Sequence, residues 1–120
     1  MLVYIPTFES KENEREVIQI HEWDTWSLDH TLAKIIYPAL CNFHADSRSY
    51  PTGLDREDVA EIHREQSDEV IWGLIVNEMI TAFYLRLQDD FYDFDTSNEK
   101  YNKMQNGLRL FGKYYTHLWR

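Results

Sequence analysis

One predicted helix of this chain is apolar on almost every side, and it limits the folds that the chain can adopt. It extends from about Ser67 to Asp89, and only a narrow polar strip interrupts its apolar surface. A helix of this kind must be covered all round, either as the central member of a bundle or by a second subunit. Its apolar residues are Val70, Ile71, Trp72, Leu74, Ile75, Val76, Met79, Ile80, Ala82, Phe83, Leu85 and Leu87.

Two further helices, each with one apolar face, are predicted on either side of it in the sequence. The first begins near Ser27, with Asp24 and Ser27 as competing N-caps, and contains Pro38, which should kink it. The last begins at a capping box formed by Thr96 and Glu99. Its apolar residues alternate spacings of three and four, as in the seam of a bundle or coiled coil. These residues are Tyr101, Met104, Leu108, Phe111, Tyr115 and Leu118.

The remaining predicted elements are short. A polar helix is expected from about Arg56 to Arg64, after a turn at residues 50–53. Leu2–Ile5 and Val17–His21 are typical of two short strands, which would form a ribbon too small to be stable by itself. Such a ribbon must pack on helices or pair with another subunit, and for this reason we expect a homo-oligomer.

The length of 120 residues is that of a single domain. We therefore expect a mainly α fold, a small helical bundle of three main helices and one short helix with a short N-terminal β-ribbon. The ribbon would occupy residues 1–22 and the bundle residues 23–120.

The charge of the chain is unevenly distributed. Residues 100–120 contain five basic residues and no acid, so they carry +5, and because the whole chain carries −9 the remaining residues carry −14. The net charge argues against general nucleic-acid binding, which needs a surface that neutralises phosphates. Two alternatives remain for the basic segment. It could fold onto the acidic body, or it could present its basic face to one anionic ligand.

Composition also limits the cellular setting. No apolar run approaches the roughly 20 residues that a membrane span needs. Residues 1–6 lack the basic and apolar regions of a secretion signal. Cys41 is the only cysteine, which excludes an internal disulfide framework. We therefore expect a cytosolic protein with no membrane partner.

Two carboxylates are predicted to point toward the core. On a helical wheel Asp29 falls between Ile36 and Leu40, and Glu78 falls within the apolar arc of the central helix. Buried carboxylates are costly unless they are paired, hydrogen-bonded or protonated. Asp29 could interact with the free N–H groups of its helix, and Glu78 could pair with Arg109 or Lys113. Alternatively, both could contact a ligand or a metal ion.

Neither a cofactor nor a metal site is expected. The five histidines are scattered and show no ligand spacing, although Asp29, Glu78 and a histidine such as His30 could meet in space. No serine or cysteine lies in a nucleophile motif, and the chain has only four glycines and no phosphate loop. These features favour a binding protein over an enzyme.

Two tryptophans flank the start of the first helix. Trp23 and Trp26 could simply pack there, since aromatic rings bury a large area. Alternatively they could form a stacking platform for a base, with a phosphate near the helix N-terminus or near Arg109 and Lys113. Those two basic residues share one side of the last helix, away from its apolar seam.

Four blocks follow one another between residues 23 and 119. They are DTWSLDHTLA with IIYPAL (24–40), YPTGL (50–54), NEMITAF (77–83) and GLRLFGKYY (107–115). In this order they resemble a family of small proteins of tailed bacteriophages. The resemblance carries no established activity or catalytic residue. It implies an accessory protein of the host bacterial cytoplasm, of a kind that often counters host defences.

Three functions are compatible with these features. The leading hypothesis is an anti-defence "sponge" that sequesters a nucleotide-derived immune signal, such as a cyclic oligonucleotide or an ADP-ribose derivative, without cleaving it. Its ligand-binding residues would be Trp23, Trp26, Asp29, His30, Glu78, Arg109 and Lys113. The alternative is an acidic module that binds and inhibits a host protein. The third is a metal-dependent nucleotide hydrolase that uses Asp29 and Glu78.

Overall fold

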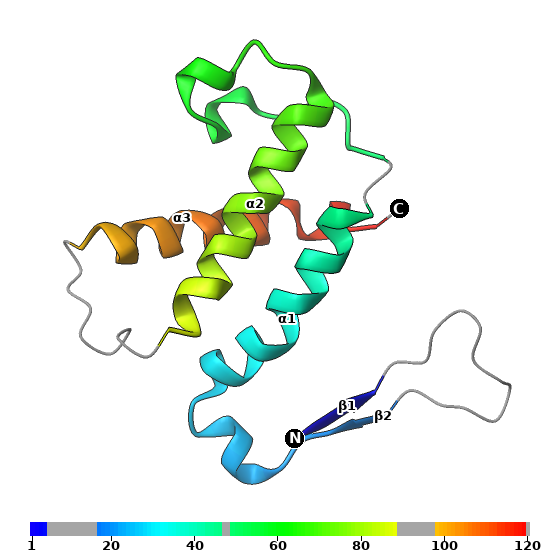
Figure 1. Ribbon diagram of the computed structural model, residues 1–120, viewed down its shortest axis with the longest axis vertical. Coiled ribbons are helices and arrows are strands. Elements are labelled where there is room, and N and C mark those ends of the chain that lie inside the picture. The colour runs from blue at the N-terminus through cyan, green and yellow to red at the C-terminus, as the bar shows by residue number, and fades with distance from the viewer. Residues whose placement is uncertain (5–16, 47–48, 89–97, 120) are drawn as a thin grey trace, which may run out of the picture.

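The computed structural model describes residues 1–4, 17–46, 49–88 and 98–119 (Figure 1). It is mainly α-helical with a two-stranded antiparallel ribbon at the N-terminus, which confirms the predicted fold class. In the ribbon Leu2 lies opposite Gln19. The main elements are β1 (Leu2–Tyr4), β2 (Val17–Gln19), α1 (Leu28–Ala45), α2 (Asp68–Arg86) and α3 (Glu99–Tyr114).

Helix α2 is the central member of the bundle, as its all-round apolar surface predicts. It packs against α1 on one side and α3 on another (Figure 1). Ile71, Ile75 and Met79 are completely buried along its length. The buried residues from other elements that complete the core are Ala33, Leu40, Leu54, Val59, Leu110 and Tyr114.

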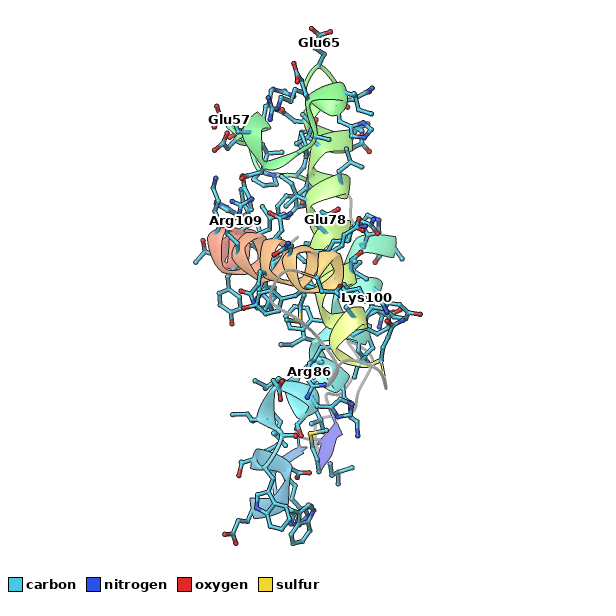
Figure 2. The ribbon with its side chains drawn as sticks, turned by 90° about the vertical axis from the view of Figure 1, so that its left-hand side faces the viewer. Glu57, Glu65, Glu78, Arg86, Lys100 and Arg109 are labelled. Carbon is cyan, nitrogen blue, oxygen red and sulfur yellow. The ribbon has the colours of Figure 1, made fainter. Side chains whose placement is uncertain are left out.

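Helix α3 crosses α2 at Gly107, where the two backbones come very close (Figure 2). A Cβ at Gly107 would lie 2.3 Å from the carbonyl oxygen of Glu78 and 2.5 Å from the Cβ of Ala82. Only glycine permits this approach, because a methyl group would overlap the backbone of α2.

This crossing shifts the buried face of α3 away from the predicted seam. The buried residues of the helix are Met104, Gly107, Leu110 and Tyr114. Leu108 and Tyr115, which were expected in the seam, are exposed. The prediction was right for Met104 and wrong for Leu108 and Tyr115, because it counted large apolar residues, whereas the closest contact is made by the residue without a side chain.

The predicted start of α1 is confirmed, and of the two expected N-caps the structure selects Ser27. Ser27 occupies the N-cap position without a side-chain hydrogen bond. Asp24 instead caps the preceding 3-10 helix η1 (Glu22–Thr25), where its carboxylate accepts a hydrogen bond of 2.9 Å from the backbone N–H of His21. Its carbonyl oxygen accepts a bond of 2.8 Å from the hydroxyl of Thr31 in α1. Asp24 therefore ties η1 to the first turn of α1.

The predicted short helix is replaced by two 3-10 turns, η2 (Arg56–Asp58) and η3 (Glu61–His63). The backbone is extended at Val59 between them, where the side chain is buried in the core. A continuous helix would not satisfy both the burial of Val59 and the inward position of Asp58. The turn before this segment is confirmed, because Gly53 has a positive φ of 71°.

The first turn of α3 is capped by a side chain. The N-cap of α3 is Asn98, whose side chain accepts a bond of 2.7 Å from the N–H of Lys100. The expected N-cap, Thr96, lies outside the described residues.

Among the helices that the structure describes, none combines the length and the apolar run that crossing a membrane requires.

The crossing at Gly107 can be tested by adding one methyl group. We expect Gly107→Ala to lower the free energy of unfolding by at least about 2 kcal/mol, because the methyl group overlaps a backbone carbonyl that cannot move aside. Gly112→Ala is the matched control, since a Cβ there meets nothing within 4 Å. It should stabilise the helix by about 0.5–1 kcal/mol. Urea unfolding followed by circular dichroism measures both, and equal effects would contradict the close crossing.

Candidate functional site

The two tryptophans at the start of α1 are open to solvent. Trp23 lies in η1 with 61% of its surface exposed, and Trp26, which follows η1, is 82% exposed. The imidazole of His21 stacks on the Trp23 ring, with a centroid distance of 4.7 Å and an angle of 11° between the planes. Of the two alternatives for these side chains, core packing is therefore wrong.

Aliphatic side chains extend the exposed apolar surface on both sides of η1. Leu28 and Leu32 lie one turn apart on α1, and each remains close to half exposed. The first two turns of α1 thus have the apolar face that the sequence predicts, but no described element covers it. Ile18 in β2 and Ile20 after it are exposed as well. We call this set the entry surface: Ile18, Ile20, Trp23, Trp26, Leu28 and Leu32.

The charges that accompany the entry surface are acidic. Residues 17–33 include Glu22, Asp24 and Asp29 but no lysine or arginine. The backbone hydrogen bond from His21 lowers the pKa of Asp24, so this carboxylate is ionised at neutral pH. The amino group of Met1 lies 3.1 Å from the same carboxylate and connects the ribbon to η1.

Asp29 does not point into the core, which corrects the prediction from the helical wheel. Its side chain is 64% exposed and forms an ion pair with Arg86 of α2, whose side chain is only 7% exposed. Arg86 donates from Nε to Oδ2 and from Nη2 to Oδ1, the latter over 3.2 Å. These bonds lower the pKa of Asp29. Its carboxylate is therefore already engaged and is not a free acceptor for a ligand.

A groove of about 310 Å³ lies between the three helices beside this ion pair. Leu32 and Ile36 line it from α1, Phe83 and Arg86 from α2, and Phe111 from α3. Apart from the ion pair its walls are apolar. Leu32 belongs to both the groove and the entry surface, so the two features are continuous.

Glu78 lies on the other side of the α3 crossing from Asp29. Figure 2 shows Glu78 and Arg86 on opposite sides of α3. Glu78 lines a polar pocket of about 330 Å³ with Asp58 and His63, whereas Asp29 lines the apolar groove. The structure therefore does not bring Asp29 and Glu78 into one site.

His30 adds no metal ligand set to either carboxylate. It is half-buried on α1, next in sequence to Asp29. Within the described part of the chain, no three His, Cys, Asp or Glu side chains are arranged to hold a metal ion.

The basic residues of α3 bind a buried carboxylate. Asp58 of η2, whose side chain is 5% exposed, accepts hydrogen bonds from Arg109 over 3.0 Å, Lys113 over 2.8 Å and the hydroxyl of Tyr114 over 2.6 Å. Lys113 also contacts Asp55 at 3.1 Å. Of the two alternatives for the basic segment, Arg109 and Lys113 therefore follow the first, because they fold onto the acidic body.

The electrostatics of this cluster stabilise its ionised form. Burial opposes the charge on Asp58, but the bonds from Lys113, Tyr114 and Arg109 outweigh it and lower the pKa of Asp58. The same bonds to Asp58 and Asp55 raise the pKa of Lys113. Burial and the bond to Asp58 raise the pKa of Tyr114, which keeps its hydroxyl proton. The cluster is a structural connection between η2 and α3.

The predicted ligand residues are thus distributed over separate places. Figure 2 shows Arg109 near the middle of the molecule, while the blue segment that carries Trp23 and Trp26 lies at its lower end. Sequence reasoning identified neither Arg86 nor Asp58 as part of a site. One signal for Arg86 was available, because it is the only charged residue between Glu78 and Asp89. Asp58 gave no comparable signal, since its burial depends on the distant Tyr114.

No family model, no curated protein and no solved structure matches this chain. The entry surface, the apolar groove and the polar cluster are therefore the features on which a function can be based.

The cluster around Asp58 makes a prediction about stability. We expect Asp58→Asn to lower the free energy of unfolding by about 2 kcal/mol at pH 7, because two charge-assisted hydrogen bonds become weaker. Asp55→Asn is the matched control. Asp55 is exposed and asparagine is an equally good N-cap, so this variant should lose less than about 1 kcal/mol of unfolding free energy. Equal losses in urea unfolding would contradict the central position of Asp58.

The free energy of unfolding of the wild type and of Asp58→Asn should also depend differently on pH. A carboxylate whose pKa is lower in the folded state stabilises the fold above its unfolded pKa of 3.8. That contribution is complete above about pH 5 and is lost as the pH falls below 3.8. The stability difference between wild type and Asp58→Asn should therefore shrink below about pH 4. A difference that stays constant from pH 7 to pH 3 would show that ionisation of Asp58 is not its source.

Proposed function

We propose that this chain is a non-enzymatic binding protein that engages a protein partner through the entry surface. The observation that carries this proposal is the exposure of two neighbouring tryptophans, 61% and 82%, at the start of a helix whose first apolar turns are also uncovered. Contiguous exposed apolar surface of this kind is uncommon on a monomer and marks interaction sites.

Physical chemistry supports the entry surface as the centre of such an interface. Tryptophan is among the residues that contribute most to binding at protein interfaces, because it buries a large area at little cost in conformational entropy. The adjoining groove, with Leu32 and Phe111 in its walls, would extend the buried area. The exposed acid Glu22 at the rim favours a partner with basic residues around an apolar centre.

The resemblance to small proteins of tailed bacteriophages suggests the class of partner. An anti-defence protein in the bacterial cytoplasm would bind and inhibit a host protein of a defence system. Self-association through the same surface is the competing use of these side chains, since the N-terminal ribbon also has two open edges.

The decisive experiment replaces one tryptophan at a time. The tagged protein is purified from the bacterial host, and we expect a stoichiometric partner that Trp23→Ala and Trp26→Ala each weaken at least tenfold, measured by biolayer interferometry. Trp119→Ala is the matched control, because this tryptophan is also largely exposed but follows η5 (Tyr115–His117) and lines a hollow with Ser49 and Tyr50, beyond the C-terminal end of α1.

Two results would refute the proposal. One is a partner that both entry-surface variants retain with unchanged affinity. The other is a wild-type protein that binds no host protein and forms dimers in light scattering that Trp26→Ala dissociates, because the entry surface would then be a subunit interface.

The nucleotide sponge is a second candidate, supported by the stacked rings of His21 and Trp23. This pair presents a flat aromatic surface on which a base could stack. The expected phosphate ligands of the sponge, Arg109 and Lys113, are bound to Asp58, which weakens this hypothesis. The hydrolase hypothesis has less support, since Asp29 lines the apolar groove and Glu78 lines the separate polar pocket.

A thermal-shift screen against nucleotide immune signals tests the sponge directly. A ligand at a hundredfold excess over its Kd stabilises the fold by about 2.7 kcal/mol, which is readily detected. A shift that Trp23→Ala removes, with the ligand recovered intact by chromatography, would establish sequestration. No shift with any signal would exclude it for the compounds screened.

A further inference from the structure

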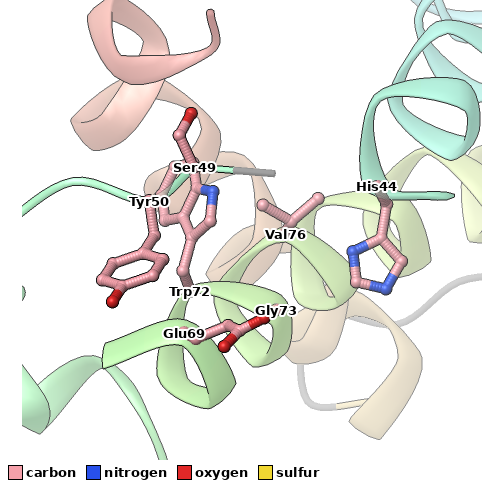
Figure 3. Close-up of a pocket in the computed structure, with 7 residues that line it drawn as sticks. All are labelled: His44, Ser49, Tyr50, Glu69, Trp72, Gly73 and Val76. Carbon is pink, nitrogen blue, oxygen red and sulfur yellow. The ribbon is translucent and has the colours of Figure 1, made fainter. Parts of the chain in front are cut away.

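A pocket separate from the entry surface lies between the end of α1, the following loop and the first turns of α2. Its lining includes His44, Tyr50, Glu69, Trp72 and Gly73, and its volume is about 170 Å³ (Figure 3). Figure 3 shows the rings of Tyr50 and Trp72 on one side and the imidazole of His44 on the other, with the side chain of Glu69 extending toward Gly73.

The pocket depends on the missing side chain of Gly73. A glycine inside a helix costs about 1 kcal/mol relative to alanine, so its presence usually has a reason. At Gly107 the reason is steric, because a Cβ would overlap α2. At Gly73 it is not, since a Cβ would meet only the Cε1 atom of His44 at an ordinary 3.7 Å. The fold accepts a Cβ at position 73, whereas a side chain there would reduce the volume of the pocket.

The chemistry of the walls selects a positively charged group. The rings of Tyr50 and of the largely buried Trp72, the imidazole of His44 and the carboxylate of Glu69 line the space, and among the residues that the structure assigns to its lining there is no lysine or arginine. Glu69 makes no described ion pair, in contrast to Asp29 and Asp58. Aromatic faces attract organic cations through the ring quadrupole, and a nearby carboxylate adds a direct charge interaction.

We propose that this pocket binds the alkylammonium group of a small organic cation. The rings of Tyr50 and Trp72 contact its methyl or methylene groups, and Glu69 balances its charge. The net charge of −9 adds a general attraction for cations. The proposal is independent of the protein-binding function above, because it uses none of the entry-surface residues.

A second hollow of about 330 Å³ continues from the first and shares Tyr50 and Ser49 with it. His117 and Trp119 line its far side, so another aromatic ring lies within reach of the same ligand. Together the two hollows reach the size of small-molecule sites, which is about 300–1,000 Å³. The ammonium group would occupy the smaller hollow and the rest of the ligand the larger one.

Choline and its uncharged isostere 3,3-dimethyl-1-butanol are suitable probes. They have nearly the same shape and differ in charge, so comparing them isolates the contribution of the cation. In titrations of the ¹⁵N-labelled full-length protein we expect choline to shift the indole N–H signal of Trp72 saturably, with a Kd of about 1 mM or tighter. The isostere should bind at least tenfold more weakly.

Two variants test the charge interaction with Glu69 and the volume of the pocket separately. Glu69→Gln should weaken choline binding at least about fivefold, the effect of one charge interaction at 4 Å in water. Glu65→Gln, an exposed glutamate four residues earlier, is its control and should change nothing. Gly73→Leu should abolish binding by filling the pocket, and Gly112→Ala controls for the general effect of replacing a helical glycine.

Each of three results would overturn the proposal. They are no saturable binding of choline, equal binding of choline and its isostere, and unchanged affinity in Glu69→Gln. The last test remains valid even if Gly73→Leu does not fold, because Glu69 is exposed and its replacement leaves the core intact.

Discussion

The contact on which this fold depends is the backbone crossing of α3 over α2 at Gly107. The carbonyl of Glu78 and the methyl group of Ala82 occupy the space where a side chain at position 107 would be. This approach fixes both the height at which α3 meets the central helix and its rotation. The apolar side of α3, with Leu108 and Phe111, then borders the groove beside α1, and its basic side faces η2.

The rotation of α3 also determines what its cations do. Arg109 and Lys113 lie one turn apart on the side that faces Asp58, and Tyr114 contributes a third hydrogen bond to the same carboxylate. A surface that would attract phosphates in an isolated helix is thereby neutralised within the protein. The acidic character of the remaining surface is preserved, and it favours cationic ligands and partners with basic rims.

The two ends of α1 differ in their chemistry, because its beginning is uncovered and a pocket lies at its end. At the beginning, Trp26 and Leu28 present a broad apolar surface suited to a macromolecule. At the end, Tyr50 and Trp72 enclose a small space beside Glu69. Both sites share one physical feature, namely aromatic rings next to unneutralised or solvent-exposed acids.

The sequence by itself determined the fold class, the limits of the three helices to within a few residues and the need to cover α2 on all sides. These follow from local hydrophobic periodicity and capping, which act over one or two turns. It did not determine which face of α3 is buried, because a glycine contact has no hydrophobic signal. Nor did it determine the exposure of Asp29 and its pairing with Arg86, or the burial of Asp58. Those outcomes depend on which distant segments of the chain meet, and only tertiary packing decides that.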